Sequence, residues 1–578
     1  MGGGSETPSR SALACGALGN YDHELVRRIA THVAEEMSVA HEDDHSILML
    51  DRPAIRWRGR GRGFAWSEGG LRHDRVTLWK GASVKLAACG LVVQDRRRRV
   101  HSSVSGIAPV YHLEHDGAVY FASRIDPLVR ALPPRLTIDW RAWASIFYLR
   151  FPLGERTPFL EVKRLRPFST LEWDETGQRR RTVEHRWPWA QIEPHLDLDP
   201  GAEAVTSAIR EAIAPLEAGP VTCTLSGGWD SRLLLCLLAE HGNDVRALTV
   251  KPDNGHDREQ ELAAGVAATL GVPHSTVEGR VEEFWADTRE RALRVDYQLA
   301  APPWAMPLAA ALKGLPGQAT DGLGLDTLAQ AGTTHYSESM IRPDGTAAIA
   351  QALWTRLLGQ VMRHATGRVL APALDEELKA LARRQFMAEA NRFRGHPAEV
   401  VLTFYATRTV RGISLTPNAI LGADMATVTP CTDDRVVTAL LETRPLEKFH
   451  ARIYRALFDQ VNPTVGDLPS THERQPAPAI TRPRRGLSRS AVRGYERVLV
   501  DGPLERILGD EVRERLAQGT LAEGLAEPAF HRGVLAVTLL HLWHERYRDR
   551  LAGDDPLGEL AGAKPGAGAS RAAATSSV

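Results

Sequence analysis

The segment VTCTLSGGWDSRLLLCLL, residues 221–238, constrains the fold of this chain more than any other. An apolar, β-branched run leads into two glycines and then into an apolar helix, the pattern of a buried strand, a tight turn and a helix. Glycines let the backbone turn sharply and bring its N–H groups close to a ligand. With two serine hydroxyls and the amino end of the helix, these groups predict a cradle for a polyphosphate. We assign this cradle to Leu225, Ser226, Gly227, Gly228, Trp229 and Ser231.

Asp230 lies inside this turn, where a carboxylate would repel a phosphate. Its presence is explained if it holds Mg²⁺, because this cation takes oxygen ligands and is commonly shared between carboxylates and phosphates. The full string, with an acidic residue and flanking serines between a strand and a helix, is far more specific than a bare glycine turn. It predicts a site for a magnesium-bound polyphosphate.

The residues after this turn alternate between helical and strand patterns. LLLCLLAEHG (233–242) predicts a helix, VRALTV (245–250) a strand, DREQELAAGVAATLG (257–271) a helix and HSTVE (274–278) a strand. Such alternation is typical of a parallel sheet with right-handed crossovers. Beyond residue 300 the sequence is mainly helical.

Between residues 45 and 185 short apolar runs are separated by turn residues. This pattern predicts a β-rich domain whose clearest strands are HSILML, LVVQD, PVYHLEH, AVYFAS and FSTLEWDETG. Four arginines at 96–99 fall between two of these strands, and we expect them to form a solvated hairpin end. The predicted fold class is therefore α/β, with a β-rich N-terminal domain before a parallel-sheet domain with helical elaboration.

Length and composition are those of a globular protein with more than one domain. The 578 residues exceed one ordinary domain. The formal net charge of zero gives no general attraction to nucleic acid or to anionic membranes. We predict disordered ends at 1–12 and 556–578, an N-terminal domain at 13–195 and a second domain at 196–555.

The cysteines and the first residues indicate a cytoplasmic protein. Five scattered cysteines without metal-ligand spacing favour reduced thiols over a disulfide framework. The N-terminus lacks the basic and apolar segments of a signal peptide. No run approaches the roughly 20 apolar residues that span a bilayer.

The string SGGWDS (226–231) resembles the PP-loop of the ATP-pyrophosphatases and lacks the GKS or GKT of a Walker A loop. This family cleaves ATP between its α and β phosphates and forms an acyl-adenylate, so the resemblance implies ATP and Mg²⁺ as cofactors. It also places Thr249 and Val250 where the family's backbone contacts adenine. The helix at 257–271 and the following VPH resemble the asparagine synthetase branch.

A second stretch, ATDGLGLDTLAQAG (319–332), resembles the asparagine synthetase loop in which glycines precede an acidic residue. Asp326 is then a second carboxylate for Mg²⁺, and Gly322 and Gly324 lie near the α-phosphate and the ribose. Together, Asp230 and Asp326 would clamp the cation against the pyrophosphate as charge develops on the leaving group.

A third stretch, VTPCTDDRVVTALLE (428–442), resembles a segment that follows a glutamate base in the asparagine synthetases. The matching position here is near Ala426, so that base is missing or supplied from elsewhere. The family's catalytic lysine is also missing, because DLPSTHER (467–474) contains none and Lys448 matches a structural lysine upstream. Candidates for proton transfer and charge stabilisation, with a solvated polar loop as the alternative, are His472, Glu473 and Arg474.

Residues 91–130 resemble the glutaminase domain of class II amidotransferases, and FLEVKRLRPFSTLEW (159–173) fits the end of that domain. The resemblance implies an Ntn-type α+β sandwich. An active glutaminase needs cysteine at residue 2, where this chain has Gly2, and the internal Cys15 would lack a free α-amine. We therefore expect an inactive domain and an amine that does not come from glutamine.

Two branches of the family use a ready-made amine, the β-lactam synthetases and the lasso peptide cyclases. The β-lactam branch carries a tyrosine in the loop that matches GLGLD, where this chain has Leu323. Trp229 and the helical part after residue 330 resemble the lasso cyclases, which adenylate an Asp or Glu side chain of a precursor core peptide for attack by its own N-terminal amine.

The resemblance to the lasso cyclases implies a set of partners. These are the core peptide as substrate, a leader-binding protein and a leader peptidase, with no nucleic acid and no membrane. The alternatives are an asparagine synthetase, a β-lactam synthetase and an ATP-binding pseudoenzyme that serves as a scaffold.

Overall fold

The computed structural model describes most of the chain between residues 13 and 553. The described residues are 13–52, 55–58, 61–66, 77–78, 84–85, 89–133, 135–176, 179–216, 219–251, 257–279, 281–330, 349–355, 366–471, 487–500 and 504–553. The ends predicted to be disordered, 1–12 and 556–578, lie outside them.

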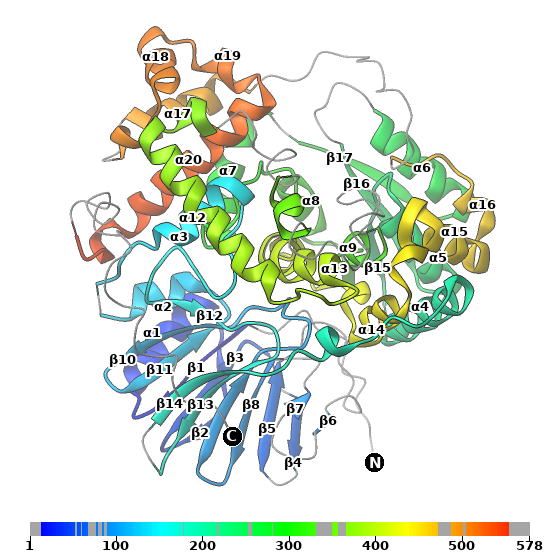
Figure 1. The fold of residues 1–578 in the computed structure, drawn as a ribbon, viewed down its shortest axis with the longest axis horizontal. Helices are drawn as coiled ribbons and strands as arrows, with labels where there is room; N and C mark the ends of the chain where they lie inside the picture. The colour runs from blue at the N-terminus through cyan, green and yellow to red at the C-terminus, as the bar shows by residue number, and fades with distance from the viewer. Residues whose placement is uncertain are drawn as a thin grey trace.

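Two antiparallel sheets lie face to face in the N-terminal region, where the strands are mostly blue in Figure 1. The first has the order β12-β10-β11-β1-β3-β2 and the second β14-β13-β9-β8-β5-β4. Side chains of both sheets, such as Leu48 and Leu91, fill one core between them. Helices α1 and α2 pack against the other face of the first sheet. The prediction that the N-terminal region is rich in β-strands is confirmed.

Five strands of this region, β3, β8, β10, β11 and β13, match the predicted apolar runs, whereas β1, α1 and β2 precede the predicted range. Hairpin β10–β11 turns at Asp116 (φ 46°) and Gly117 (φ 80°), the two positive values that a type I′ turn requires. The described elements are β1 (Ala14–Gly19), α1 (His23–Val33), β2 (Ser38–Asp43), β3 (Ser46–Leu50), β4 (Ile55–Arg58), β5 (Arg62–Trp66), β6 (Thr77–Leu78), β7 (Val84–Lys85), β8 (Cys89–Gln94), β9 (Arg97–His101), β10 (Tyr111–His115), β11 (Ala118–Ala122), α2 (Ile125–Ala131), α3 (Trp140–Leu149), β12 (Lys163–Arg164), β13 (Ser169–Asp174) and β14 (Arg179–Glu184).

The prediction that the four arginines at 96–99 form a solvated hairpin end is wrong for two of them. Arg98 and Arg99 belong to strand β9 and are buried. Arg99 Nε lies 2.5 Å from Glu172 Oε2 on β13, and Arg98 Nη2 lies 3.3 Å from Asp43 Oδ2 on β2. Carboxylates on the adjacent strand β13 and on β2 of the facing sheet thus offset the desolvation of these two guanidinium groups.

A parallel sheet with the order β17-β16-β15-β18-β19 forms the second region, as predicted. It is covered on both faces, as parallel sheets generally are. Ala247 and Leu248 on β16 point to opposite faces, and each belongs to a different hydrophobic core. Its strands are β15 (Val221–Thr224), β16 (Val245–Lys251), β17 (His274–Glu278), β18 (Gln318–Thr320) and β19 (Thr427–Val428).

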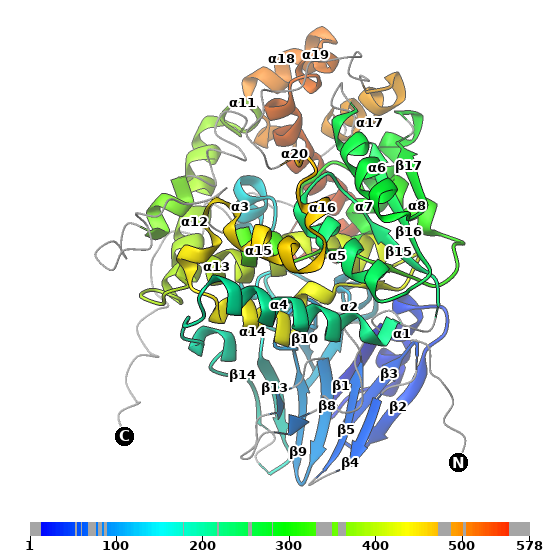
Figure 2. The same cartoon turned by 90° about the vertical axis from the view of Figure 1, so that its right-hand side faces the viewer.

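Helices surround this sheet. The last helices of the chain, orange to red, lie in the upper part of the view in Figure 2. Two consecutive segments, η7 and η8, have π-helical hydrogen bonding. The longer helical elements are α4 (Leu198–Ile213), α5 (Trp229–Glu240), α6 (Arg258–Leu270), α7 (Phe284–Arg294), α8 (Met306–Leu312), α9 (Leu325–Gln330), α12 (Pro372–Asn391), α13 (Glu399–Phe404), η7 (Tyr405–Ile413), η8 (Thr416–Leu421), α14 (Asp434–Glu442), η10 (Pro445–Ala451), α15 (Arg452–Val461), α17 (Arg489–Val500), α18 (Asp510–Gln518), α19 (Leu521–Leu525) and α20 (Pro528–Tyr547).

Helix α3 joins the two regions, because it packs against α12 and α20 of the C-terminal part. The rings of Trp143 and Trp543 lie 5.5 Å apart, and Tyr148 donates a hydrogen bond of 2.7 Å to the carbonyl of Asp375. Within the described residues, no helix is both long enough and apolar enough to cross a bilayer.

Candidate active site

Strands β15 and β18 lie side by side at the topological switch point of the parallel sheet, where the strand order changes direction. From β15 the chain adds β16 and β17 on one side, whereas β18 and β19 lie on the other side. Ligands of open parallel sheets bind at the carboxyl ends of the strands, at such a switch point. The loop 225–228 follows β15 and the loop 321–324 follows β18, so the sheet brings these two predicted segments together.

The loop after β15 is held by its own serines. Ser226 N donates to Ser231 Oγ at 2.9 Å, Gly228 N donates to Ser226 Oγ at 3.2 Å, and the two hydroxyl oxygens lie 3.0 Å apart. Leu225 N donates to the carbonyl of Leu248 on β16 at 2.8 Å. These bonds fix the loop immediately before the amino end of α5, where N–H groups and the helix dipole favour an anion.

One carboxylate already lies in this cradle. Gly227 N donates to Glu259 Oε1 of α6 at 3.0 Å. A negatively charged oxygen on this amide shows that the loop presents its donors to anions. An entering phosphate would have to displace Glu259.

Arg232 ties the loop to the segment 465–471. This arginine is fully buried, and it donates to the carbonyls of Leu468 and Pro469, both at 2.7 Å. Thr471 N in turn donates to Gly227 O at 3.1 Å. A methyl group on Gly227 would lie 2.8 Å from Thr471 Cγ2, so glycine permits this close approach.

The predicted catalytic residues come directly after this segment. His472, Glu473 and Arg474 lie outside the described residues, and their roles stay predictions.

The loop after β18 lies against the start of α5. A methyl group on Gly322 would lie 3.2 Å from Ser231 N and 3.3 Å from Asp230 Cβ. Gly324 has a φ of +98°, which favours glycine. Gly322 therefore lets Asp230 and the second loop share one narrow space, and Gly324 permits the left-handed backbone just before α9.

Asp230 is held by Tyr454 of α15, whose hydroxyl donates a hydrogen bond to Asp230 Oδ1. The ring of Tyr454 also packs on Trp229, with 5.2 Å between the ring centroids. Burial and the nearby charge of Asp326 raise the pKa of Asp230 to about 8. The predicted metal carboxylates are thus close enough to repel each other.

Asp326 forms an ion pair with an arginine, whereas no ion pair of Asp230 is found among the described residues. Arg408 Nη1 of η7 lies 2.8 Å from Asp326 Oδ2, and Thr327 N donates to Asp326 Oδ1 at 2.7 Å. Burial acts to raise the pKa of Asp326, but the Arg408 guanidinium and the hydrogen bonds from Thr327 together hold this pKa below its usual value. Burial also raises the pKa of a third carboxyl group, Asp321, which accepts a hydrogen bond of 3.0 Å from Thr224 Oγ1.

This arrangement suits a divalent cation shared with a phosphate. Asp230 and Asp326 supply oxygen ligands, and a cation would remove the repulsion between them. Within the described part of the chain, no three Asp, Glu, His or Cys side chains cluster as metal ligands. Mg²⁺ commonly takes its other ligands from phosphate and water oxygens.

Thr249 and Val250 lie at the carboxyl end of β16, the strand beside β15. Thr249 is buried, and its hydroxyl lies 2.8 Å from His274 Nε2. The end of this strand borders the loop after β15, which is the position expected for a contact with a base.

Sequence reasoning missed several residues of this site. Asp321 stands next to the predicted glycines, and Arg232 directly follows the predicted turn, so both had a local signal. Glu259, Arg408 and Tyr454 lie in helices far along the chain, and only the packing of those helices brings them here.

The nearest lysine considered above, Lys448, is fully buried in η10, and among the described residues its Nζ has no hydrogen-bond partner. Burial lowers its pKa from 10.5 to about 7. Between pH 7 and pH 10.5 Lys448 is protonated in the unfolded chain and neutral in the folded chain. The free energy of unfolding therefore rises by about 1.4 kcal/mol for each pH unit in this range. Below about pH 7 both states are protonated, and the full cost of the buried charge is present.

We therefore expect Lys448→Met to stabilise the protein most below pH 7. Its advantage over the parent should shrink as the pH rises from 7 toward 10. Urea unfolding at several pH values measures this difference. A Lys379→Met change on exposed α12 surface serves as the control, and an advantage of Lys448→Met that does not depend on pH would contradict the prediction.

Comparison with known families assigns the region that carries this site. The family model for asparagine synthase matches residues 203–464. A search of curated proteins found no match. The matched residues include both loops, Asp230, Asp326 and Tyr454, and they support an asparagine synthetase-like domain with ATP-dependent, amide-forming ligase activity.

Proposed function

We propose that this chain is a macrolactam synthetase that adenylates an Asp or Glu side chain of a lasso precursor core peptide for attack by the peptide's N-terminal amine. The observation that carries the ligase chemistry is the loop 226–231 at the switch point of the sheet. This loop contains Asp230, and the carboxylate of Asp326 lies beside it. The asparagine synthase match covers these residues.

The reaction has two steps. An oxygen of the peptide carboxylate attacks the α-phosphorus of ATP, the bond to the bridging β-phosphate oxygen breaks, and pyrophosphate leaves. The N-terminal amine then attacks the acyl carbon, the oxygen of AMP leaves with its electron pair, and the amine gives up a proton to a base. Bringing the amine to the activated carbon in one molecule supplies the effective concentration.

The described residues have distinct tasks in the first step. The N–H group of Gly227, once Glu259 is displaced from it, and the hydroxyl of Ser231 would bind phosphate oxygens. Asp230 and Asp326 would hold Mg²⁺, which neutralises charge on the leaving pyrophosphate when it is bound. Arg408 keeps the Asp326 carboxylate ionised for this task.

The position of Cys15 supports an amine source other than glutamine. Cys15 lies inside strand β1 between β11 and β3, and burial raises the pKa of its thiol to about 12. The preceding residue, Ala14, donates its N–H to Ser123 Oγ at 2.8 Å. A buried, protonated thiol within a strand cannot serve as a glutaminase nucleophile, so we regard the sandwich as a glutaminase-like domain that has lost this activity.

Leu323 favours a lasso peptide cyclase over a β-lactam synthetase, the two branches that use a ready-made amine. Its side chain is buried, and its N–H donates to Asp321 Oδ1 at 2.9 Å. This position therefore offers the substrate no polar side chain, unlike the tyrosine expected in a β-lactam synthetase. As partners we propose a leader-binding protein and a leader peptidase, which deliver the core peptide with a free amine.

The test follows AMP release and product mass with Mg·ATP and a panel of acceptors. The panel holds free-N-terminus peptides with Asp or Glu several residues in, aspartate with ammonia, and a carboxyethyl amino acid. One AMP for each peptide that loses one water would support the proposal. AMP release with only the small acceptors, or with none of the panel, would overturn it.

The hydrogen bond from Tyr454 to Asp230 allows a finer test of the metal carboxylate. We expect Tyr454→Phe to raise the Mg²⁺ concentration for half-maximal activity by about tenfold, because a freely rotating carboxylate is a poorer ligand. The melting temperature should change little, since the ring that packs on Trp229 remains.

Tyr495→Phe is the matched control, because the Tyr495 hydroxyl lies 3.0 Å from His531 Nε2 in the C-terminal helices. An unchanged Mg²⁺ requirement in Tyr454→Phe would show that this tyrosine does not orient Asp230.

A further inference from the structure

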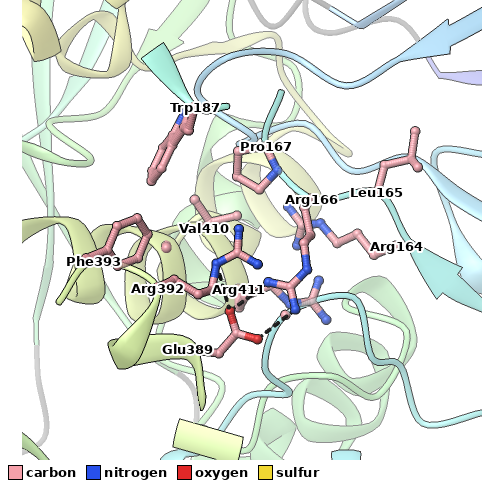
Figure 3. A pocket seen from close by; sticks show the side chains of 12 residues that line it. Arg164, Leu165, Arg166, Pro167, Trp187, Glu389, Arg392, Phe393, Val410 and Arg411 are labelled. Carbon is pink, nitrogen blue, oxygen red and sulfur yellow. Dashed lines mark hydrogen bonds and ion pairs between the residues drawn. The ribbon is translucent and has the colours of Figure 1, made fainter. Parts of the chain in front are cut away.

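Four arginines line a pocket where the N-terminal region meets α12 and η7. Figure 3 shows their guanidinium groups gathered around the single carboxylate of Glu389. The lining comes from segments far apart in the sequence, which are the stretch around β12, the end of α12 and the π-helical η7. The charged residues of the lining are Arg164, Arg166, Arg392, Arg411 and Glu389.

Part of this positive charge is paired. Arg166 binds Glu389 in a two-pronged contact, with Nη1 to Oε2 and Nη2 to Oε1 both at 2.7 Å. Arg392 forms an ion pair with Glu184 of β14 and lies 3.9 Å from Glu389 Oε2. Glu389 and Glu184 thus pair with Arg166 and Arg392, and Arg164 Nη2 donates to the carbonyl of Gly106 at 2.7 Å.

Arg411 is different, because it is buried with an exposed fraction of only 2%. It donates to the carbonyls of Pro152 and Arg156 and to the Gln298 amide oxygen at 3.3 Å. Its Nη1 has no hydrogen-bond partner among the described residues, and no carboxylate in that part of the chain lies within ion-pair distance of it. Burial, together with the nearby Arg164 and Arg166, lowers the pKa of Arg411 to about 9.

A buried guanidinium without a counter-charge costs free energy unless an anion joins it. Glycine at position 154 helps to keep this space open. A methyl group on Gly154 would lie 2.5 Å from Glu389 Oε1 and 2.6 Å from Arg166 Nη2. The rings of Trp187 and Phe393 form an apolar wall on one side (Figure 3).

We propose that this pocket is a binding site for a small oxyanion, a carboxylate or phosphate group, which accepts a hydrogen bond from Arg411 Nη1 beside Arg164 and Arg392. Planar guanidinium groups match both kinds of anion. The pocket lies apart from the phosphate cradle, and η7 separates the two, with Arg408 facing Asp326 and Arg411 lining the pocket. The proposal is independent of the macrolactam reaction.

Thermal unfolding and equilibrium dialysis of the full chain test this site. The probes are inorganic phosphate and succinate, compared with chloride at matched ionic strength so that general salt effects cancel. We expect at least one of the two probes to bind and to raise the melting temperature. Phosphate alone would identify phosphate esters as the source of the ligand, and succinate alone would identify carboxylic acids.

Arg411→Gln should weaken this binding by about tenfold or more, because it removes the charged donor. Arg392→Gln keeps the hydrogen bonds of Arg411 named above and should also weaken binding. It therefore tests the site in case Arg411→Gln fails to fold. Arg210→Gln on α4, whose partner is the exposed Glu240, is the matched control and should bind as the parent does.

Ser231→Ala distinguishes binding at the pocket from binding at the phosphate cradle, because it alters that loop and leaves the pocket intact. Binding that survives Ser231→Ala and is lost in the arginine variants would support the pocket. Binding lost only in Ser231→Ala, equal binding by Arg392→Gln and the parent, or no shift with either probe would overturn the proposal.

Discussion

Replacing Asp230 with asparagine is expected to lower the rate of AMP formation by about a thousandfold or more, because one metal carboxylate disappears at the point where charge develops on pyrophosphate. The variant should nevertheless fold as stably as the parent. Asparagine can still accept the Tyr454 hydrogen bond, and it removes a half-buried carboxylate whose pKa is raised to about 8. Pyrophosphate release and urea unfolding measure the two effects separately.

The matched control for this change is Asp199→Asn in the exposed first turn of α4. It makes the same chemical substitution far from both loops and should leave activity and stability within error. An Asp230→Asn variant that retained more than about a tenth of the parent rate would exclude the assigned role, since a metal ligand contributes far more than this.

Replacing Arg232 with methionine is expected to destabilise the protein by about 3–5 kcal/mol, since charged hydrogen bonds are lost and buried carbonyls remain without a donor. Arg232 Nη1 and Nη2 serve the carbonyls of Val465, Leu468 and Pro469, which a methionine cannot replace. The segment 465–471 would also lose its tie to the phosphate cradle, so the KM for ATP should rise. Urea midpoints and ATP kinetics are the measurements.

Arg232→Lys should recover only part of this loss, because an ammonium group cannot reach carbonyls in two directions as the planar guanidinium does. Arg210→Met is the control, since its exposed pair with Glu240 contributes less than about 1 kcal/mol. Equal destabilisation by the Arg232→Met and Arg210→Met changes would contradict the role given to Arg232.

The strand, turn and helix around residues 221–238 could be predicted because the chemistry is local. Glycines, serines and an apolar run are enough to predict the loop, although contacts with Leu248 and Thr471 also hold it. The partner loop at 319–332 was predicted from resemblance, and the structure places it against Asp230 because β18 pairs directly with β15. That pairing spans about 100 residues and leaves no sign in either segment alone.

Other features depend on packing and could not be read from the sequence. Arg98 and Arg99 look like a charged turn, and only the register of β9 with β13 shows that Glu172 receives Arg99. Tyr454 and Arg408 look like ordinary helical residues, and they reach the site because α15 and η7 pack beside it. The pocket around Arg411 is assembled from several such segments and had no sequence signal.

The packing of helix α3 also has a consequence for thermal unfolding. Nearly all of its residues are buried, and its Trp143 and Tyr148 contact partners contributed by α20 and α12. Neither the sandwich nor the parallel-sheet region can cover that apolar surface without the other. The two should therefore unfold together in one calorimetric transition, with no half-folded species between them. ATP that binds beside the parallel sheet would then also protect the antiparallel strands of the sandwich from heat, because both belong to a single cooperative unit.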